Sequence, residues 1–191
     1  MINFITISAP SGAGKTTLCK ALRSVKPEIE WSISYTTRLK REMEKDGIDY
    51  HFITMDRFET FILKDKFVEW ENVHGYYYGT ARDTLEDAIK NDKTLLLEMD
   101  VKGSMSIKKL YPEYTFSIFI LPPSLEHLRD RLKNRGTDSD GRIEIRLRRF
   151  QQEIEYKDRF DQVMINEDLE SAKHELINIV NQLKQGVING A

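Results

Sequence analysis

The chain of 191 residues has one cysteine, no long apolar run and little net charge, and each of these shortages excludes a class of protein. Its one cysteine, Cys19, excludes an internal disulfide and is typical of a reducing compartment. No apolar run approaches the roughly 20 residues of a membrane-spanning helix, and Met1-Ile2-Asn3 leaves no room for a signal peptide before the first predicted strand. A formal net charge of −2 gives no overall positive field. We therefore expect a cytoplasmic protein that binds neither nucleic acid nor membranes.

The order of the elements predicts one α/β domain with a central parallel sheet flanked by helices. The composition, 40% hydrophobic and 31% charged, is ordinary for such a domain. Apolar strands are predicted at Ile2–Ser8, Thr94–Met99, Phe116–Leu121 and Gln162–Ile165. Helices are predicted at Lys15–Val25, Ala81–Lys90, Val101–Leu110, Leu125–Arg135, Arg142–Arg159 and Leu169–Leu183.

Residues 32–80 break this alternation and are expected to form a lobe inserted into the core. Strands are predicted there at Trp31–Thr36, Tyr50–Ile53, Phe67–Val73 and Tyr76–Thr80, with a short helix at Asp56–Lys64 that Asp56 caps. The predicted parts are therefore a core of residues 1–31, 81–123 and 160–191, the lobe of 32–80, and a lid of 124–159.

The stretch from Phe4 to Thr17 predicts a phosphate-binding loop between a buried strand and a helix. Gly12 and Gly14 allow backbone N–H groups to approach an anion, and the helix adds unpaired N–H groups at its start. Lys15 can bridge β- and γ-phosphate oxygens, and the Thr16 hydroxyl can bind Mg²⁺. Ala9 stands where the usual motif opens with glycine.

The lobe carries residue types suited to a second nucleotide. Arginines and tyrosines can hold a phosphate by charge-assisted hydrogen bonds. Glu69 and a second carboxylate can accept both N–H donors of a guanine edge, and a hydroxyl at Ser34 or Thr80 can donate to its O6. Each of these residues alone also fits an ordinary structural role.

Charged residues outside the lobe complete the set. Asp100 follows an apolar strand, so it can support Mg²⁺ through water, reach the second nucleotide, or cap the next helix. Arg131 and Arg135 lie one helical turn apart. With Arg146 they can stabilise the charge of a transferring phosphoryl group if the lid moves over it.

Over nearly its whole length the chain resembles the guanylate kinases, P-loop enzymes that phosphorylate GMP. The resemblance is carried by Ser8-Ala9-Pro10-Ser11-Gly12-Ala13-Gly14-Lys15-Thr16-Thr17, Ser34-Tyr35-Thr36-Thr37-Arg38, Asp49-Tyr50-His51-Phe52, Gly75-Tyr76-Tyr77-Tyr78-Gly79-Thr80, Ile118-Phe119-Ile120-Leu121-Pro122-Pro123-Ser124 and Arg131-Leu132-Lys133-Asn134-Arg135-Gly136. It implies a P-loop core, a GMP-binding lobe and a helical lid, with ATP and GMP as substrates and Mg²⁺ as cofactor.

The resemblance also implies a set of site residues. Those expected to contact ATP are Ser11, Gly12, Ala13, Gly14, Lys15, Thr16, Thr17 and Asn166. Those expected to contact GMP are Ser34, Glu69, Thr80 and Asp100 at guanine, and Arg38, Arg41, Tyr50 and Tyr78 at its phosphate. The expected catalytic residues are Lys15, Arg38, Arg131, Arg135 and Arg146, with Thr16 on Mg²⁺ and Asp100 as a further candidate through water.

The chain departs from the family pattern in two places. Leu39-Lys40-Arg41-Glu42-Met43 lacks the usual prolines and glycine, so we expect a more flexible loop there. Glu98 stands where many members carry aspartate.

Three alternative functions remain open from the sequence. A non-catalytic guanylate-kinase-like binding module would have a degraded P-loop, whereas this one is intact. A kinase for another small phosphorylated substrate would not need an acid such as Glu69. A nucleic-acid-binding ATPase would carry a basic stripe. The sequence leaves the oligomeric state open.

Overall fold

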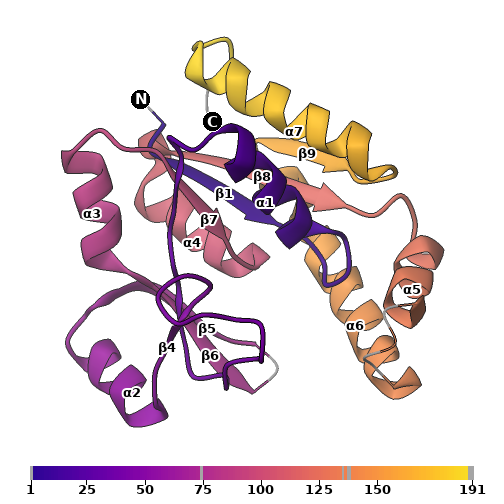
Figure 1. The fold of residues 1–191 in the computed structure, drawn as a ribbon, viewed down its shortest axis with the longest axis horizontal. Helices are drawn as coiled ribbons and strands as arrows, with labels where there is room; N and C mark the ends of the chain where they lie inside the picture. Colours follow the sequence, from indigo (N-terminus) through magenta and orange to yellow (C-terminus); the bar gives the residue numbers. More distant parts are fainter. Residues whose placement is uncertain (1, 74, 135, 137–138, 189–191) are drawn as a thin grey trace.

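The computed structural model describes residues 2–73, 75–134, 136 and 139–188. Figure 1 shows a core sheet flanked by helices, a smaller lobe beside it, and two helices, α5 and α6, that extend from the other side. The mixed α/β architecture with a central parallel sheet confirms the predicted fold class. The described helices include none that is both long and apolar enough to cross a membrane.

Five parallel strands form the core sheet. Their order is β2 (Glu30–Trp31), β7 (Leu95–Glu98), β1 (Phe4–Ser8), β8 (Thr115–Leu121) and β9 (Gln162–Ile165). The central strand β1 pairs with β7 on one side and with β8 on the other. Because the strands are parallel, the loops after β1 and β7 leave the same edge of the sheet, where α/β proteins bind their ligands.

Helices cover both faces of this sheet. Ile5 and Ile7 of β1 are buried on the face covered by α1 (Lys15–Val25) and α7 (Leu169–Lys184). Phe4, the residue before Ile5, faces the opposite side, against α3 (Arg82–Lys90) and α4 (Val101–Leu110). A short 3₁₀ turn, Pro112–Tyr114, leads into β8. All five residues of β1 are buried, as expected for a strand covered on both faces.

The lobe is a separate four-stranded sheet beside helix α2 (Met55–Leu63). Its strand order is β4 (His51–Phe52), β3 (Tyr35–Thr36), β6 (Tyr76–Ala81) and β5 (Phe67–Val73). The prediction that Asp56 caps the helix is wrong, because the Thr54 side chain accepts the Arg57 N–H. Asp56 lies in the first turn instead, where an acid also suits the helix dipole.

The prediction of one continuous strand over residues 31–36 is wrong. Trp31 pairs with Leu96 in the core sheet, whereas Tyr35 pairs with His51 and Gly79 in the lobe sheet. The chain therefore passes from one sheet to the other within four residues. Alternation of side chains along the sequence reports extended backbone but not the sheet that each residue joins.

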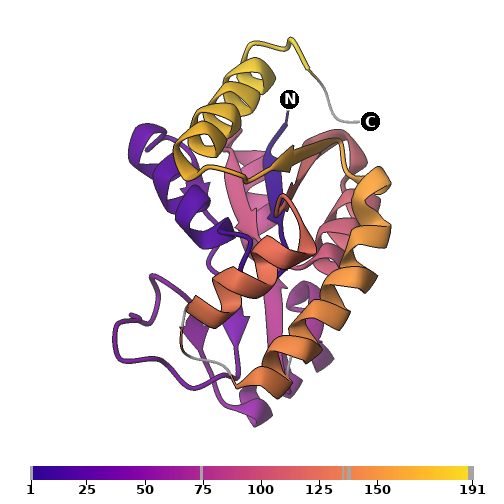
Figure 2. The same cartoon turned by 90° about the vertical axis from the view of Figure 1, so that its right-hand side faces the viewer.

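The segment predicted as a lid contains two helices, α5 (Leu125–Asn134) and α6 (Asp140–Glu153), which lie side by side in Figure 2. Leu128, Leu132 and Leu147 form part of a small core between them. The predicted helix over 142–159 stops being α-helical at Glu153 and continues as a 3₁₀ segment, Ile154–Arg159. The segment ends where Phe160 stacks on Phe119 of the core, at 4.9 Å between ring centroids.

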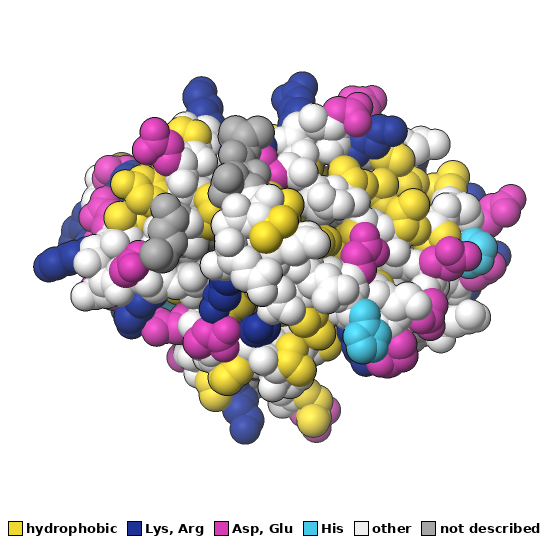
Figure 3. Space-filling view, turned by 90° about the horizontal axis from the view of Figure 1, so that it is seen from above, with side chains coloured by type: hydrophobic (Ala, Val, Ile, Leu, Met, Phe, Trp, Pro, Cys, Tyr) yellow, Lys and Arg dark blue, Asp and Glu magenta, His cyan; other side chains and the backbone are white. Residues whose placement is uncertain are grey.

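Charges of both signs cover the surface. Figure 3 shows Lys and Arg side chains distributed among Asp and Glu side chains on the face seen from above. Such a mixed surface is typical of a protein with a net charge near zero.

Candidate active site

The loop between β1 and α1 forms a compact backbone turn. The Ala13 N–H donates to the Pro10 carbonyl at 3.0 Å, and Gly12 and Gly14 have φ angles of 97° and 92°. These left-handed angles suit glycine. Gly14 is the N-cap of α1 and makes no side-chain cap. The first N–H groups of the helix therefore point toward the place where an anion would bind.

The two polar residues at the start of α1 point toward the end of β7. Lys15 Nζ donates to the Met99 carbonyl at 3.0 Å. The Thr16 hydroxyl donates to Glu98 Oε1 at 2.6 Å. The start of α1 and the end of β7 thus bring an ammonium, a hydroxyl and a carboxylate together, which is a combination suited to a phosphate with its divalent cation.

Asn166, just after β9, holds the same loop from the other side. Its side chain is buried and its Nδ2 donates to the Ala13 carbonyl at 2.7 Å. A Cβ at Gly14 would lie 2.4 Å from that nitrogen, so only glycine fits there. Among the described residues, Asn166 Oδ1 is the buried side-chain atom without a hydrogen-bond partner. It is therefore a buried acceptor next to the loop whose hydrogen-bonding capacity is unused.

Arg38, Tyr50 and Tyr78 lie together in the lobe. Arg38 Nε donates to the Tyr78 hydroxyl at 3.2 Å, and its guanidinium lies 5.4 Å from the Tyr50 ring centre. Burial lowers the pKa of Arg38, but hydrogen bonds to Glu44 and Tyr78 outweigh it and the net pKa is raised. Burial raises the pKa of the Tyr50 phenol. This group therefore presents a permanent cation and two phenol hydroxyls, which suit a phosphate site.

Glu44 occupies the N–H edge of the Arg38 guanidinium. Its two oxygens accept from Arg38 Nη1 and Nη2 at 2.9 and 2.8 Å, and it also accepts the Arg41 N–H at 2.8 Å. The Arg41 side chain is 71% exposed, and its Nη1 lies 3.9 Å from Glu44 Oε1, the same oxygen that accepts from Arg38 Nη2 at 2.8 Å. Glu44 therefore brings Arg41 near Arg38, but the Arg41 side chain stays mostly in solvent.

Glu69, Thr80 and Asp100 come together where the lobe meets α4. The Thr80 hydroxyl donates to Glu69 Oε1 at 2.5 Å, and Asp100 caps α4 by accepting the Gly103 N–H at 2.8 Å. Burial, reinforced by the charge of Asp100, raises the pKa of Glu69 to about 7, although the Thr80 hydrogen bond opposes the rise. Ser34 lies just before β3, and its carbonyl accepts the His51 N–H at 2.9 Å.

The lid contributes two of the predicted arginines. Arg146 Nη1 contacts the Ser11 hydroxyl in the loop after β1. Arg131 Nη2 donates to the carbonyls of Asn166 and Glu167, at 2.9 and 3.2 Å. Arg135 lies outside the described residues. Thr17 is exposed on the first turn of α1.

Three acidic or basic side chains that the sequence did not single out for the site also lie in it. Glu98 contacts Thr16, Glu44 contacts Arg38, and Arg149 donates to Asp100 at 3.2 Å. The position of Glu98 at the carboxyl end of a predicted parallel strand indicates a site residue, for the same reason that Asp100 is predicted. Glu44 and Arg149 belong to no motif and become visible only from their contacts.

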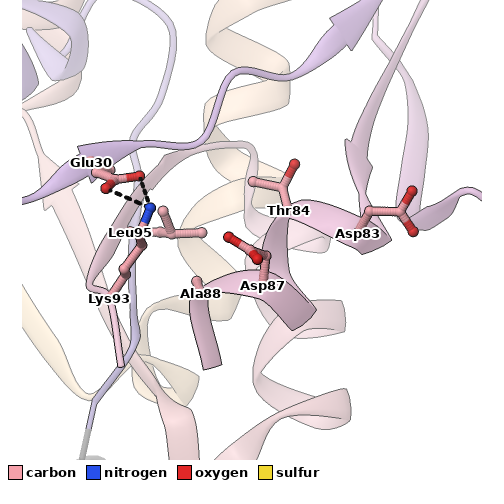
Figure 4. A pocket seen from close by; sticks show the side chains of 7 residues that line it. All are labelled: Glu30, Asp83, Thr84, Asp87, Ala88, Lys93 and Leu95. Atoms are coloured by element: carbon pink, nitrogen blue, oxygen red, sulfur yellow. Dashed lines mark hydrogen bonds and ion pairs between the residues drawn. The ribbon is translucent and has the colours of Figure 1, made fainter. Parts of the chain in front are cut away.

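A separate pocket of about 320 Å³ lies between α3 and the β2 edge of the core sheet. Figure 4 shows its lining, in which Lys93 bonds to Glu30 while Asp83 and Asp87 project from α3. None of the predicted site residues lines it.

Comparison with known proteins identifies the family of this chain. The family model described as "Guanylate kinase" matches residues 1–183. A guanylate kinase from Carboxydothermus hydrogenoformans is 44% identical over 90% of this chain and 84% of its own, and one from Syntrophotalea carbinolica is 45% identical over 91% and 82%. The chain belongs to the guanylate kinase family. A crystal structure of guanylate kinase from Anaplasma phagocytophilum superposes with a TM-score of 0.75 at 30% identity, covering 94% of this chain and 85% of that one.

Membership of the guanylate kinase family indicates that the loop after β1 and the polar residues of the lobe belong to one site. The loop after β1 with Lys15 and Thr16 lies at the carboxyl edge of the core sheet, and the Arg38 and Glu69 groups lie in the lobe. Glu69 of the lobe and Asp100 of the core both lie beside Gly103 of α4, so the lobe meets the core near this edge. A kinase needs such an arrangement because donor and acceptor must meet.

Proposed function

We infer that this protein is an ATP:GMP phosphotransferase, which transfers the γ-phosphoryl group of ATP to GMP and yields ADP and GDP. The observation that carries this inference is the intact loop after β1, in which Lys15 and Thr16 face the end of β7 in a chain of the guanylate kinase family. A binding module without catalysis has no use for that loop. The function therefore rests on chemistry that the described residues still possess.

ATP is assigned to the loop after β1. The backbone N–H groups of residues 11–17 would hold its phosphates, with the Lys15 ammonium on the β- and γ-phosphate oxygens. The Asn166 side chain borders this loop through its hydrogen bond to the Ala13 carbonyl and is the proposed contact at the adenine end of ATP. Arg131 and Arg146 approach the loop from the lid and would neutralise charge on the transferring group.

GMP is assigned to the lobe. Arg38, Tyr50 and Tyr78 would hold its phosphate, and Glu44 now occupies the N–H edge of the guanidinium that a phosphate would use. At the base, the carboxylates of Glu69 and Asp100 would accept the two N–H donors of guanine. Ser34 and Thr80 remain candidates for its O6, and Arg41 would have to turn inward to reach the phosphate.

The residues around Thr16 fit a magnesium ion. Mg²⁺ prefers oxygen ligands and keeps several waters beside substrate phosphates. The Thr16 hydroxyl and the Glu98 carboxylate, 2.6 Å apart, offer such oxygens. We propose that Thr16 binds the ion directly and Glu98 through water, with Asp100 as the second carboxylate at this edge. The ion would neutralise charge on the ATP phosphates when bound.

The chain's own part in the reaction is positioning and charge stabilisation. The GMP phosphate is largely ionised at neutral pH, so a phosphate oxygen can attack without a strong general base. Arg38 orients that phosphate, and Lys15 with the lid arginines stabilises the charge that spreads over the transferring group. Movement of the lid toward the lobe would exclude water and prevent hydrolysis of ATP.

The test is ADP release by the purified protein with Mg-ATP and one nucleoside monophosphate at a time. We expect turnover with GMP at least about a hundredfold faster than with AMP, CMP or UMP, because only guanine presents its donors to both carboxylates. Faster turnover with another monophosphate would preserve the kinase and overturn the guanine assignment. Binding of GMP without turnover would favour the binding module.

The raised pKa of Glu69 predicts a pH dependence of GMP use. With a pKa of about 7, the empty site holds mainly the carboxylate above pH 7 and the neutral acid below it. The carboxylate accepts both guanine N–H donors more strongly than the neutral acid, which has one acceptor oxygen and a competing O–H, so kcat/KM for GMP is expected to fall about tenfold from pH 8 to pH 6. The measurement is kcat/KM for GMP across this range at saturating ATP.

The Glu69→Gln variant is the control, because GMP itself changes charge near pH 6. Glutamine keeps an acceptor oxygen but does not titrate. In this variant, kcat/KM should therefore change with pH only because the GMP phosphate changes its charge. The ratio of the two profiles isolates Glu69. If the two profiles coincide in shape, Glu69 does not control GMP binding.

A further inference from the structure

Arg149 on α6 joins the lid to the acceptor side of the site. Its Nη2 donates to Asp100 Oδ2 at 3.2 Å, and its Nε donates to Glu153 Oε1 at 2.7 Å. The side chains of Arg149, Asp100 and Glu153 are 27%, 17% and 10% exposed. The guanidinium is therefore held between two carboxylates largely removed from water, where charge-assisted hydrogen bonds are strong.

Both oxygens of Asp100 are held by these contacts. Oδ1 accepts the Gly103 N–H of α4, and Oδ2 accepts from Arg149 of the lid. An ionised carboxylate has about four acceptor positions, so each oxygen retains one for a ligand. Because α4 and the lid anchor different oxygens, the direction of the remaining lone pairs is set.

Arg149 also brings positive charge to a place where two acids lie close together. A Cβ atom built on Gly103 would lie 3.0 Å from Glu69 Oε2 and 3.3 Å from Asp100 Oδ1. Both carboxylates therefore lie next to Gly103 and close to each other. Their mutual repulsion would drive the Asp100 side chain away from Glu69. The guanidinium of Arg149 opposes that displacement.

The same helix touches the donor side. Arg146 lies three residues before Arg149, so the two share one side of α6. Arg146 contacts Ser11 in the loop after β1, and Arg149 contacts Asp100 after β7. One helix of the lid therefore reaches both substrate positions, with Arg149 on the acceptor side.

We propose that Arg149 is a positioning residue for GMP that acts through Asp100. It holds the Asp100 carboxylate in the orientation that receives the N–H donors of guanine. This inference rests on the proposed function, since it takes Asp100 as part of the guanine site. It assigns to the lid a contribution to recognition of the base in addition to its contribution to the phosphoryl group.

The first experiment is steady-state kinetics of Arg149→Ala. We expect KM for GMP to rise about tenfold, while KM for ATP and kcat stay within about twofold of wild type. Arg149→Lys keeps the charge and should recover most of the loss. Arg148→Ala is the matched control, because Arg148 is the preceding arginine of α6 and is exposed; it should behave as wild type.

A double-mutant cycle with Asp100→Asn tests whether the effect passes through Asp100. Asparagine still caps α4 well, so the helix start is preserved. If Arg149 acts through Asp100, the double variant has the same KM for GMP as Asp100→Asn alone. Additive increases would overturn the proposal, as would equal increases in KM for GMP and ATP, which would indicate general loosening of the lid.

GMP affinity measured by calorimetry without ATP separates this inference from the proposed function. Wild-type protein that binds GMP but releases no ADP would overturn phosphoryl transfer, while the affinities of the variants would still test Arg149. An Arg149→Ala variant with wild-type affinity for GMP would overturn the role of Arg149. A wild-type protein that binds no GMP would overturn both.

Discussion

Replacement of Lys15 by alanine is expected to reduce kcat by about a thousandfold or more. Removing one preorganised donor from a site that stabilises developing charge commonly costs a hundredfold to a thousandfold. Lys15 carries a full charge, and its ammonium lies at the start of α1, 3.0 Å from the Met99 carbonyl. It therefore lies where, in the proposed function, the phosphates of ATP would meet the edge of the core sheet.

The measurement is ADP release with saturating Mg-ATP and GMP, accompanied by calorimetry of GMP alone. GMP binding should be preserved, because the acceptor contacts lie in the lobe. Lys20→Ala serves as the control, since Lys20 is an exposed lysine on the same helix. Turnover near that of wild type in Lys15→Ala would remove this residue from its catalytic role.

Replacement of Arg38 by alanine is expected to lower kcat/KM for GMP by about a thousandfold, mainly through KM. The guanidinium offers a planar fork, now bound to Glu44, that matches a phosphate. Its Nε also orients the Tyr78 hydroxyl at 3.2 Å. The variant therefore loses both the charge and the orientation of a neighbouring donor. The kinetic constants for GMP and ATP, determined separately, check this expectation.

The Arg38→Ala variant also leaves the Glu44 carboxylate without its main partner. The hydrogen bonds from Arg38 hold the pKa of Glu44 below its usual value, outweighing the opposite effect of burial. We therefore expect the melting temperature to fall by about 4 °C. Adding Glu44→Gln should restore the melting temperature but not GMP affinity. Arg57→Ala, at an exposed arginine of the lobe, is the control. If the double variant regains GMP affinity, Arg38 acts only through stability.

The phosphate-binding loop was predictable because its chemistry is local. A buried strand, two glycines and Lys15-Thr16 occur within one short stretch, and the strand–turn–helix geometry follows from those residues alone. The apolar strand before Asp100 was predictable for the same reason. Their meeting at one edge of the sheet followed from the parallel topology.

The separation of Trp31 from Tyr35 into two sheets was not predictable. Both residues lie in extended backbone with similar side chains, and the pairing partners Leu96 and His51 decide the sheet that each joins. The same holds for Glu98 and Thr16, which are 82 residues apart in the chain yet share a hydrogen bond. The parallel topology brings the loop and the strand end to one edge, but only the folded chain decides which side chains there bond to each other.

The sequence by itself determined the family, the fold class and the residue types available for phosphoryl transfer, because motifs and apolar periodicity are written in neighbouring residues. The tertiary structure alone decided which charges meet. It paired Arg38 with Glu44, placed Arg149 on Asp100, and left Arg41 in solvent. The physical reason is that a charge responds to groups within a few ångströms, and chain folding sets those distances independently of separation along the sequence.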